Sequence, residues 1–267
     1  MYGEVKSVEK LTPTMIRVVL HNGELANFAG SNATDAYVNA RFVPAGSPVE
    51  VPFGPDDLEG LAPEHRPRPR RFTIRRWDSQ RHELTIDFVA HGDVGFAGSW
   101  AQRATPGDRL QFDGPGGSYR PSSQVDWHLI GGDESAFPAI AASIEALPAH
   151  AQAIAFVVVD GPEHELDIDA QADVALTWLH RDSSPAPELL LPEAVSSAEF
   201  PQGTFDVFVH GEAGEVRAVR RHLVGDRGVD ESTASISPYW RRTFTDEAWR
   251  EVKRGWMAEQ ARDTVPS

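Results

Sequence analysis

LIGGDESAFPAI, residues 129–140, joins an apolar run that begins at Trp127 to a segment with helical periodicity. The apolar run is typical of a buried strand, and the Gly-Gly pair makes a tight turn. In the segment that follows, apolar residues recur at the spacing of a helix face, at Ile140, Ile144 and Leu147. Strand, turn and helix in this order predict that an α/β domain begins here.

The turn in this stretch is a candidate nucleotide site, because open α/β sheets bind nucleotides at the carboxyl ends of their strands. The candidate residues are Gly132, Asp133, Glu134 and Ser135. The acidic pair is unusual for a loop that holds pyrophosphate, since it would repel phosphate. Two alternatives stay open: Asp133 caps the following helix, or the segment is only a tight strand–helix turn.

The α/β pattern continues through the second half. Further strands are expected over residues 153–159, 174–180 and 205–210, and a helix over residues 213–223. The near-continuous apolar run of the first of these strands is typical of a parallel strand that is covered on both faces. These elements predict an open parallel sheet with helices.

A last helix is expected over about residues 245–262, with Thr245 as its N-cap. We expect it to bury one stripe, formed by Trp249, Val252 and Trp256. The segment SPYWRR, residues 237–242, precedes this helix and follows a loop. Its candidate residues Tyr239, Trp240 and Arg241 could cover a flat cofactor, or the two aromatic residues could simply anchor the helix.

Short alternating strands dominate the first half of the chain. They are expected over residues 2–10, 14–22, 37–43, 70–78, 83–91 and 108–113. The segment 44–69 is rich in Pro, Gly and acidic residues, and we expect it to be a long loop. Many short strands with turn signals predict a barrel or a sandwich. The change of period near residues 121–126 predicts two domains, residues 1–124 and 125–267.

Composition excludes several classes of protein. The chain has 267 residues and no Cys, which excludes disulfides, thiolate nucleophiles and thiolate-held iron–sulfur clusters. No His pair has the spacing of a zinc site, so no metal ligands are predicted. No apolar run is long enough for a membrane span, and the first residues do not resemble a signal peptide. We therefore expect a cytoplasmic protein with a small ligand.

The charge is strongly acidic overall, yet the positive residues are grouped. Lys plus Arg is 25 and Asp plus Glu is 40, which gives a formal net charge of −15 and disfavours nucleic acid as a partner. Only three of the positive residues are Lys. Six Arg lie in one short run, at positions 66, 68, 70, 71, 75 and 76. Arg binds planar anions in a bidentate way, so the run suggests an anionic ligand. Solvated surface charge is the alternative.

Two neighbouring motifs in the first half could hold a phosphate-bearing ring. In RRFTIR, residues 70–75, strand geometry places Arg70 and Phe72 on one face and Thr73 on the other. HGDVGFAGSWA, residues 91–101, follows the next strand and leads into a helix that starts near Ala97. Small residues let a ligand approach the backbone, and a helix start offers free N–H groups. An ordinary barrel strand and a Gly-rich turn are the alternatives.

The four motifs, in this order, resemble those of the siderophore-interacting protein family of flavin-dependent ferric-siderophore reductases. That family carries Arg-x-Tyr-Thr-x-Arg, His-Gly-x-x-Gly-Pro-Ala-x-x-Trp-Ala, Gly-Asp-Glu-Thr-Ala-Leu-Pro-Ala-Ile and a Gly-Tyr-Trp-Arg segment. Here they read RRFTIR, HGDVGFAGSWA, GDESAFPAI and PYWRR. Phe72, Phe96 and Pro238 stand where the family has Tyr, Pro and Gly.

The resemblance implies a ferredoxin reductase-like fold with two domains. The first is an antiparallel six-stranded Greek-key β-barrel that binds FAD, and the second is an α/β open parallel sheet that binds NAD(P)H. The implied flavin-binding residues are Arg70, Phe72, Thr73, Arg75, His91, Gly92, Gly95, Ala97, Gly98, Ser99 and Trp100. Gly132, Asp133, Glu134 and Ser135 would face the nicotinamide nucleotide and the flavin, and Tyr239, Trp240 and Arg241 would close the site.

The implied activity is a reductase that passes electrons from NAD(P)H through FAD to the Fe(III) of a siderophore, which releases Fe(II) for iron uptake. No acid–base catalytic residue is required. NADPH, NADH and a ferredoxin stay open as electron donors, with a slight preference for NADPH, and we expect a monomer. Two alternatives are a general NAD(P)H-flavin or ferredoxin-type oxidoreductase with another acceptor, and a non-catalytic protein that binds an anionic ligand.

Overall fold

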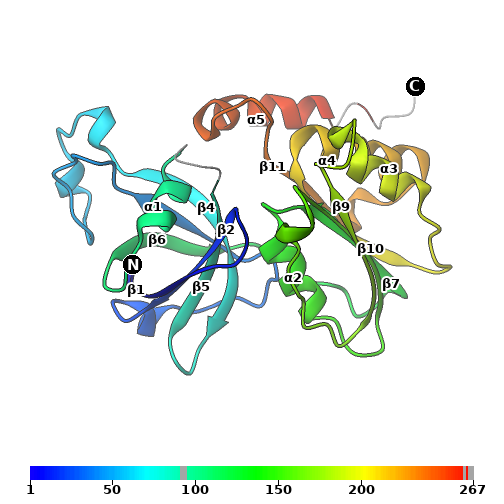
Figure 1. Cartoon of the computed structure of the whole chain (residues 1–267), viewed down its shortest axis with the longest axis horizontal. Coiled ribbons are helices and arrows are strands. Elements are labelled where there is room, and N and C mark those ends of the chain that lie inside the picture. Colours follow the sequence, from blue (N-terminus) through cyan, green and yellow to red (C-terminus); the bar gives the residue numbers. More distant parts are fainter. Residues whose placement is uncertain (91–94, 261–262, 264–267) are drawn as a thin grey trace. The chain divides into compact units, whose positions relative to one another are not determined.

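The computed structural model describes residues 1–90, 95–260 and 263. The chain forms two compact units, Met1–Arg120 and Pro121–Ser267 (Figure 1). No helix in these described ranges has the length and apolar character that a membrane crossing requires.

The alternating strands of the first unit close into an antiparallel barrel. Its strands are β1 (Tyr2–Lys10), β2 (Met15–His21), β3 (Tyr37–Phe42), β4 (Arg68–Asp78), β5 (Glu83–Val89) and β6 (Arg109–Gly116). They are ordered β1-β2-β5-β4-β3-β6, and β6 pairs with both β1 and β3. Because β2 lies beside β5 rather than β3, the connection is of the Greek-key type. The predicted six-stranded antiparallel Greek-key barrel is confirmed.

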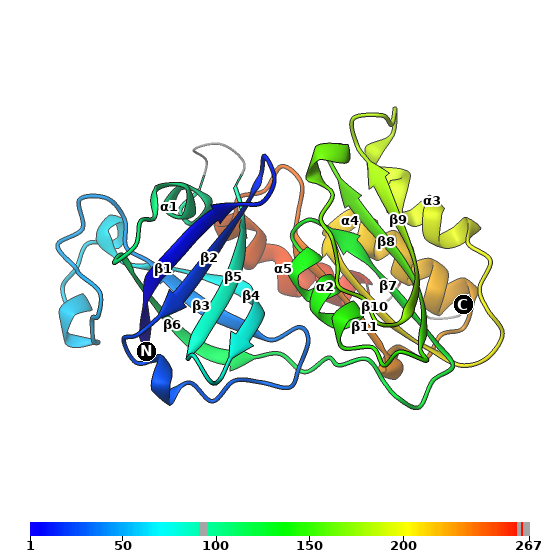
Figure 2. The same cartoon turned by 60° about the horizontal axis from the view of Figure 1, so that its bottom comes forward.

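Alternate side chains of the strands fill the barrel. Val18, Leu20, Ile86, Phe88 and Phe112 have at most 7% exposure, as do most of their neighbours in this core. The helix α1 (Ala97–Arg103) packs against β2 and β5 (Figure 2). The loop between β3 and β4 carries only the short helical turns Asp56–Leu58 and Pro63–His65, and a third such turn, Leu25–Asn27, follows β2.

The second unit is a parallel five-stranded sheet. Its strands are β7 (Trp127–Asp133), β8 (Gln152–Val159), β9 (Asp173–His180), β10 (Phe205–Glu212) and β11 (Ala234–Trp240), in the order β11-β10-β7-β8-β9. Its helices are α2 (Phe137–Glu145), α3 (Leu190–Ser197), α4 (Ala213–Arg220) and α5 (Asp246–Gln260). Helix α2 lies on one face of the sheet, and α3 and α4 lie on the other (Figure 2). The predicted open parallel sheet is confirmed.

Three details of this unit differ from the sequence-based expectations. Helix α3 was not expected, and the segment that ends in Tyr239-Trp240 is the edge strand β11 rather than a loop. Pro238 interrupts the strand pattern in the sequence, because Pro cannot donate a ladder hydrogen bond. A strand at the edge of a sheet nevertheless tolerates Pro. Val252 is 41% exposed, so the expected stripe of α5 was wrong at that position. The buried line runs through Trp249, Trp256 and Gln260, and Val252 lies about 60° away from Trp249 around the helix.

Candidate functional site

The two faces of β4 are occupied as strand alternation predicts. Phe72 pairs with Val38 and Arg70 pairs with Ala40, and both partners are fully buried inside the barrel. Directly paired residues of an antiparallel ladder lie on the same face, so Arg70 and Phe72 share the interior side. Thr73 pairs with Tyr37 on the opposite face and is itself 8% exposed.

Phe72 and Trp100 contribute to the end of the barrel core. The ring centroid of Phe72 lies 4.5 Å from that of Phe88 and 5.9 Å from that of Phe42. Trp100, on α1, lies 5.7 Å from each of the same two rings. Both candidate residues are half-buried. Trp100 therefore holds α1 against the strands, and Phe72 packs against the same two rings.

Two guanidinium groups gather beside the residue that precedes α1. The Cζ atoms of Arg68 and Arg70 each lie 5.7 Å from the centroid of the Phe96 ring. Arg68 Nε is buried and has no hydrogen-bond partner among the described residues. A buried guanidinium N–H group without a partner lowers the stability of the fold unless a hydrogen-bond acceptor reaches it. This position therefore suits an anionic group of a ligand.

The glycines of the second motif have different local roles. Gly98 lies inside α1, where a Cβ atom would meet Cα of Ala90 at 3.0 Å, so its small size serves the packing of the helix on β5. Gly95 has φ of +89° and nothing within 4 Å of the position of a Cβ atom, so it makes a turn beside open space. Ala97 and Ser99 are buried. The candidates His91 and Gly92 lie outside the described residues.

Arg75 belongs to a charged group that the motifs did not reveal. Its Nε atom lies 4.0 Å from Oδ2 of Asp87, whose side chain is fully buried. Arg17 donates two hydrogen bonds to the same carboxylate, at 2.7 and 2.8 Å. The signal in the sequence is a single acid between Ile86 and Phe88, in a strand that is otherwise apolar at these positions. Asp87 orders both guanidinium groups on the outer surface of the barrel.

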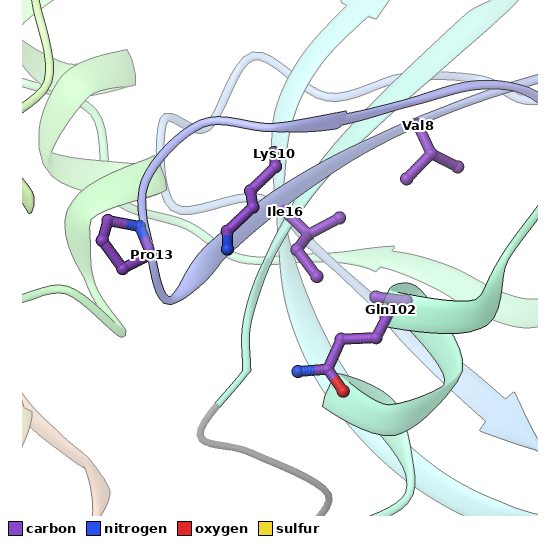
Figure 3. A pocket seen from close by; sticks show the side chains of 6 residues that line it. Val8, Lys10, Pro13, Ile16 and Gln102 are labelled. Atoms are coloured by element: carbon purple, nitrogen blue, oxygen red, sulfur yellow. The ribbon is translucent and has the colours of Figure 1, made fainter.

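A shallow hollow on the barrel lies between the β1–β2 turn and α1 (Figure 3). It has a volume of about 200 Å³ and is lined by Val8, Lys10, Pro13, Ile16, Ala101 and Gln102. Pockets for drug-sized ligands usually measure roughly 300–1,000 Å³. The hollow is too small for a dinucleotide, and none of the candidate residues lines it.

In the second unit, glycines let β7 and β10 approach closely at their carboxyl ends. A Cβ atom on Gly132, which has φ of +156°, would lie 2.0 Å from the carbonyl oxygen of His210. A Cβ atom on Gly211 would lie 2.7 Å from Oδ2 of Asp133. Gly132 is therefore required by the contact between the two strands, whatever it does for a ligand.

Asp133, the last residue of β7, is bonded to three other parts of the second unit and is only 1% exposed. Its Oδ1 atom accepts hydrogen bonds from the backbone N–H of Ser135 at 2.9 Å and from the hydroxyl of the same residue. Its Oδ2 atom accepts from the backbone N–H of Glu212 at 2.8 Å and from Nε1 of Trp240 at 2.7 Å. The acid that looked unfavourable for a phosphate loop thus orders the turn before α2, the start of α4 and the end of β11.

Glu134 pairs with an arginine that follows β9. Arg181 donates to Oε1 and Oε2 of Glu134, at 3.0 and 2.7 Å, and also to Oδ1 of Asp160 at 2.9 Å. Burial, together with the charge of Asp133, raises the pKa of Glu134 to about 7 although Arg181 opposes the shift. No sequence motif indicates this partner, because Arg181 lies 47 residues further along the chain.

Two further buried carboxyl groups, those of Glu212 and Glu215, lie at the start of α4. Glu212 caps this helix through bonds from the backbone N–H groups of Gly214 and Glu215, and also accepts a bond from the backbone N–H of Arg242. Glu215 is 2% exposed, and its Oε1 atom accepts a bond from Arg242 at 2.9 Å. Burial, with the charge of Asp133 next in size, raises the pKa of Glu215 to about 8.

The aromatic segment 239–241 is fastened within its own unit. Trp249 of α5 donates from Nε1 to the carbonyl oxygen of Tyr239 at 3.2 Å, and the Arg241 guanidinium lies 4.6 Å from the ring centroid of Phe244. Thr245 Oγ1 accepts a bond from the backbone N–H of Ala248, which confirms it as a cap of α5. These contacts agree with the helix-anchor interpretation.

The structure thus brings one candidate group together and separates another. Gly132, Asp133, Ser135 and Trp240 meet at the carboxyl ends of β7, β10 and β11, through Asp133. In the barrel, Arg70 and Phe72 lie on one face of β4 and Thr73 on the other, although all three are close in sequence. Arg17, Asp87, Asp160, Arg181, Glu212 and Glu215 were not singled out from the sequence, and Arg68 was named only as a member of the Arg run.

Comparison with known proteins assigns both units to one family. Residues 4–119 match the siderophore-interacting FAD-binding domain, and residues 125–243 match the siderophore-interacting protein model. The ferric vibriobactin reductase ViuB of Vibrio cholerae is 33% identical over 94% of this chain and 92% of its own. The NADPH-dependent ferric-chelate reductase of Escherichia coli is 29% identical over 88% of this chain and 91% of its own.

Solved structures agree with this assignment. The siderophore-interacting protein SipS of Aeromonas hydrophila has a TM-score of 0.82 and 30% identity, over 97% of this chain and 98% of its own. Phthalate dioxygenase reductase has a TM-score of 0.62 at 13% identity, over 92% of this chain and 70% of its own, which shows the ferredoxin reductase-like fold. The chain, with its FAD-binding barrel and parallel sheet, belongs to the siderophore-interacting protein family.

Proposed function

We propose that this protein is a ferric-siderophore reductase, in which the barrel holds FAD, the parallel sheet takes NAD(P)H, and electrons pass to Fe(III) in its chelate. The observation that carries the proposal is the match of both units to the two models of this family. The names of the Vibrio and Escherichia relatives, both of them ferric reductases, support it further.

The chemistry explains why a flavin is needed. A nicotinamide nucleotide gives up two electrons as a hydride, whereas Fe(III) takes one. Bound FAD supplies the link, since it accepts a hydride and passes electrons on singly. Siderophores hold Fe(III) with hard oxygen donors, and these donors bind Fe(II) much more weakly. Reduction of the iron is therefore enough to release it.

The residues of the barrel fit a flavin nucleotide. Arg68 Nε is buried and has no hydrogen-bond partner among the described residues, and Arg70 lies beside it at the Phe96 ring. These observations support a role of both arginines in holding the pyrophosphate. Arg75 and Thr73, on strand β4, are the groups that would bind the ring system. Asp87 and Arg17 would then act as positioning residues, because they fix the side chain of Arg75.

The parallel sheet fits a nicotinamide nucleotide by its strand order. In the order β11-β10-β7-β8-β9 the connections reverse direction between β7 and β10, and open sheets bind ligands at such a point. Asp133 would hold the turn after β7 rigid there, rather than contact phosphate, since both its oxygens are already bonded within the protein.

The proposal is tested with purified protein under anaerobic conditions. It should be yellow, lose its visible flavin absorbance on addition of NADH or NADPH, and regain it when a ferric hydroxamate or ferric catecholate is added. Reoxidation by quinones or a ferredoxin, with no reaction toward ferric chelates, would contradict the assignment. If a reduced ferredoxin bleaches the flavin and neither nucleotide does, the electron donor is a ferredoxin. The proposed ferric acceptor is not affected by that result.

The flavin site is tested by two substitutions. Arg68→Gln should lower FAD occupancy, because the amide carries no charge for the pyrophosphate. Arg81→Gln is the matched control: Arg81 follows β4 and its side chain is 73% exposed, so FAD content should not change. Equal FAD content in both variants would show that the pyrophosphate binds elsewhere.

A further inference from the structure

The second strand of the parallel sheet ends at a carboxylate. Strand β7 comes first in this unit, β8 pairs beside it, and Asp160 directly follows β8. In dinucleotide-binding sheets, an acid at this place accepts hydrogen bonds from the hydroxyls of the adenosine ribose. Folds that take the 2′-phosphate instead have an arginine free to meet it.

The arginine nearest to this position is already neutralised. Arg181, after β9, is joined to the end of β8 by a bond from its backbone N–H to the carbonyl oxygen of Val159, at 2.9 Å. Its guanidinium donates to Asp160 at 2.9 Å and to both oxygens of Glu134, and the side chain is only 14% exposed. Glu134 stands in the turn after β7, so the ion pairs connect the ends of β7, β8 and β9.

The surroundings of Arg181 are acidic. From Asp160 to Asp182 the chain has no other Lys or Arg, and it carries Glu163 and Glu165 in the turn after β8. His180 is paired with Glu165, at 2.7 Å. A 2′-phosphate carries negative charge and would meet carboxylates here, and like charges at an interface are strongly unfavourable.

We propose that Asp160 makes this protein select NADH over NADPH, by accepting hydrogen bonds from the adenosine ribose and by holding Arg181 away from a 2′-phosphate. The inference rests on the proposed function of the sheet, and it names the nucleotide. It departs from the slight preference for NADPH that the sequence suggested, and from the NADPH in the name of the Escherichia relative.

Binding of ADP-ribose and of 2′-phospho-ADP-ribose to the FAD-loaded protein tests the inference by calorimetry. Neither compound carries a nicotinamide, so no hydride is transferred and the readout is independent of activity. The wild-type protein should bind ADP-ribose about tenfold more tightly or better. Equal or tighter binding of the 2′-phosphate would overturn the inference.

Two variants of Asp160 assign the effect to this residue. Asp160→Ser and Asp160→Asn should both release Arg181 from one carboxylate and tighten binding of 2′-phospho-ADP-ribose by about tenfold, while ADP-ribose binding weakens. Asp173→Ser removes the same charge from an exposed residue at the other end of β9, and should leave both affinities unchanged. An equal effect of Asp173→Ser, or none in either Asp160 variant, would contradict the assignment.

The nucleotide preference and the ferric-reductase activity can be disproved independently of each other. If neither compound binds, the inference falls. The ferric-reductase proposal would still stand if the dithionite-reduced protein is reoxidised by a ferric chelate. If the reduced protein does not react with the chelate, the proposed function falls, while the difference between the two compounds still decides the nucleotide.

Discussion

At the level of single residues, the parallel sheet keeps several carboxyl groups away from water at the ends of β7 and β10. Asp133, Glu134, Glu212 and Glu215 are each less than 9% exposed. Buried charges are tolerated when hydrogen bonds replace water, and Asp133 has such bonds at both oxygens. Glu215 is less well compensated, since its Oε2 atom has no hydrogen-bond partner among the described residues.

The raised pKa of Glu215 predicts a pH dependence of stability. Between pH 4.5 and about 8 the folded protein keeps a proton that the unfolded chain has lost, so the free energy of unfolding falls as pH rises. One such proton contributes a slope of at most about 1.4 kcal/mol per pH unit. Glu134, with a pKa near 7, acts in the same direction at lower pH, so the interval from pH 7 to 8 reports on Glu215.

Urea unfolding at pH 5, 7 and 8 measures this slope. Glu215→Gln should flatten it between pH 7 and 8 and should gain stability relative to the wild-type protein as pH rises, because the amide never ionises. Glu188→Gln changes an exposed carboxyl and should leave the slope as it is. A slope that stays unaltered in Glu215→Gln would show that this group is ionised in the folded protein.

At the level of elements, β11 and α5 are held to the sheet by a few polar contacts between residues that are far apart in the sequence. Trp240 reaches Asp133, and Trp249 reaches the backbone of Tyr239. Lys253 donates to the carbonyl oxygen of Pro238 at 2.7 Å. The segment 238–240 therefore joins α5 to the carboxyl edge of the sheet, at the place where the nucleotide is proposed to bind.

The bond from Trp240 to Asp133 is expected to stabilise the fold. Trp240→Phe keeps an aromatic ring but leaves the buried carboxylate short of one donor, which should cost about 1.5–3 kcal/mol in the free energy of unfolding. Trp178→Phe makes the same change at a half-buried tryptophan whose indole N–H has no hydrogen bond to any described residue, and it should cost less. Equal losses in thermal and urea unfolding would mean that packing, and not this bond, fastens the segment.

Regular elements could be predicted from the sequence because their signals are local. The alternation in β2, β4 and β5, the apolar run of β8 and the Thr245 cap of α5 all depend on residues within one element. Strand β11 was missed because Pro238 interrupts its pattern. A strand can contain this Pro only at the edge of a sheet, and that position depends on the order of all five strands. Val252 was misplaced because a spacing of three residues can fall on either side of a helix face.

The site was only partly predictable for the same reason. The motifs located Arg70, Phe72 and the turn after β7, but the partners that decide what these residues do come from other elements. Arg181 reaches Glu134 across 47 positions, and Trp240 reaches Asp133 across 107. No spacing rule links such residues, so a phosphate loop and a buried structural acid look alike in the sequence.

At the level of the whole molecule, one chain combines an FAD-binding domain with a sheet of the nucleotide-binding type. One unit is the FAD-binding domain of the family, and the other is a parallel sheet with the strand order of nucleotide-binding folds. The absence of Cys from the sequence excludes a thiolate-held iron–sulfur cluster. In the proposed function, flavin is the redox centre through which a two-electron donor is matched to one-electron iron.

The number of Fe(II) ions formed for each flavin reoxidised can be measured. Protein that carries reduced FAD is titrated anaerobically with a ferric hydroxamate, and the Fe(II) released is captured by a ferrous-specific chromogenic chelator. The account predicts about two Fe(II) for each flavin reoxidised, because each iron takes one electron from a carrier of two. Flavin that stays reduced in the presence of the ferric chelate, with no Fe(II) formed, would contradict it.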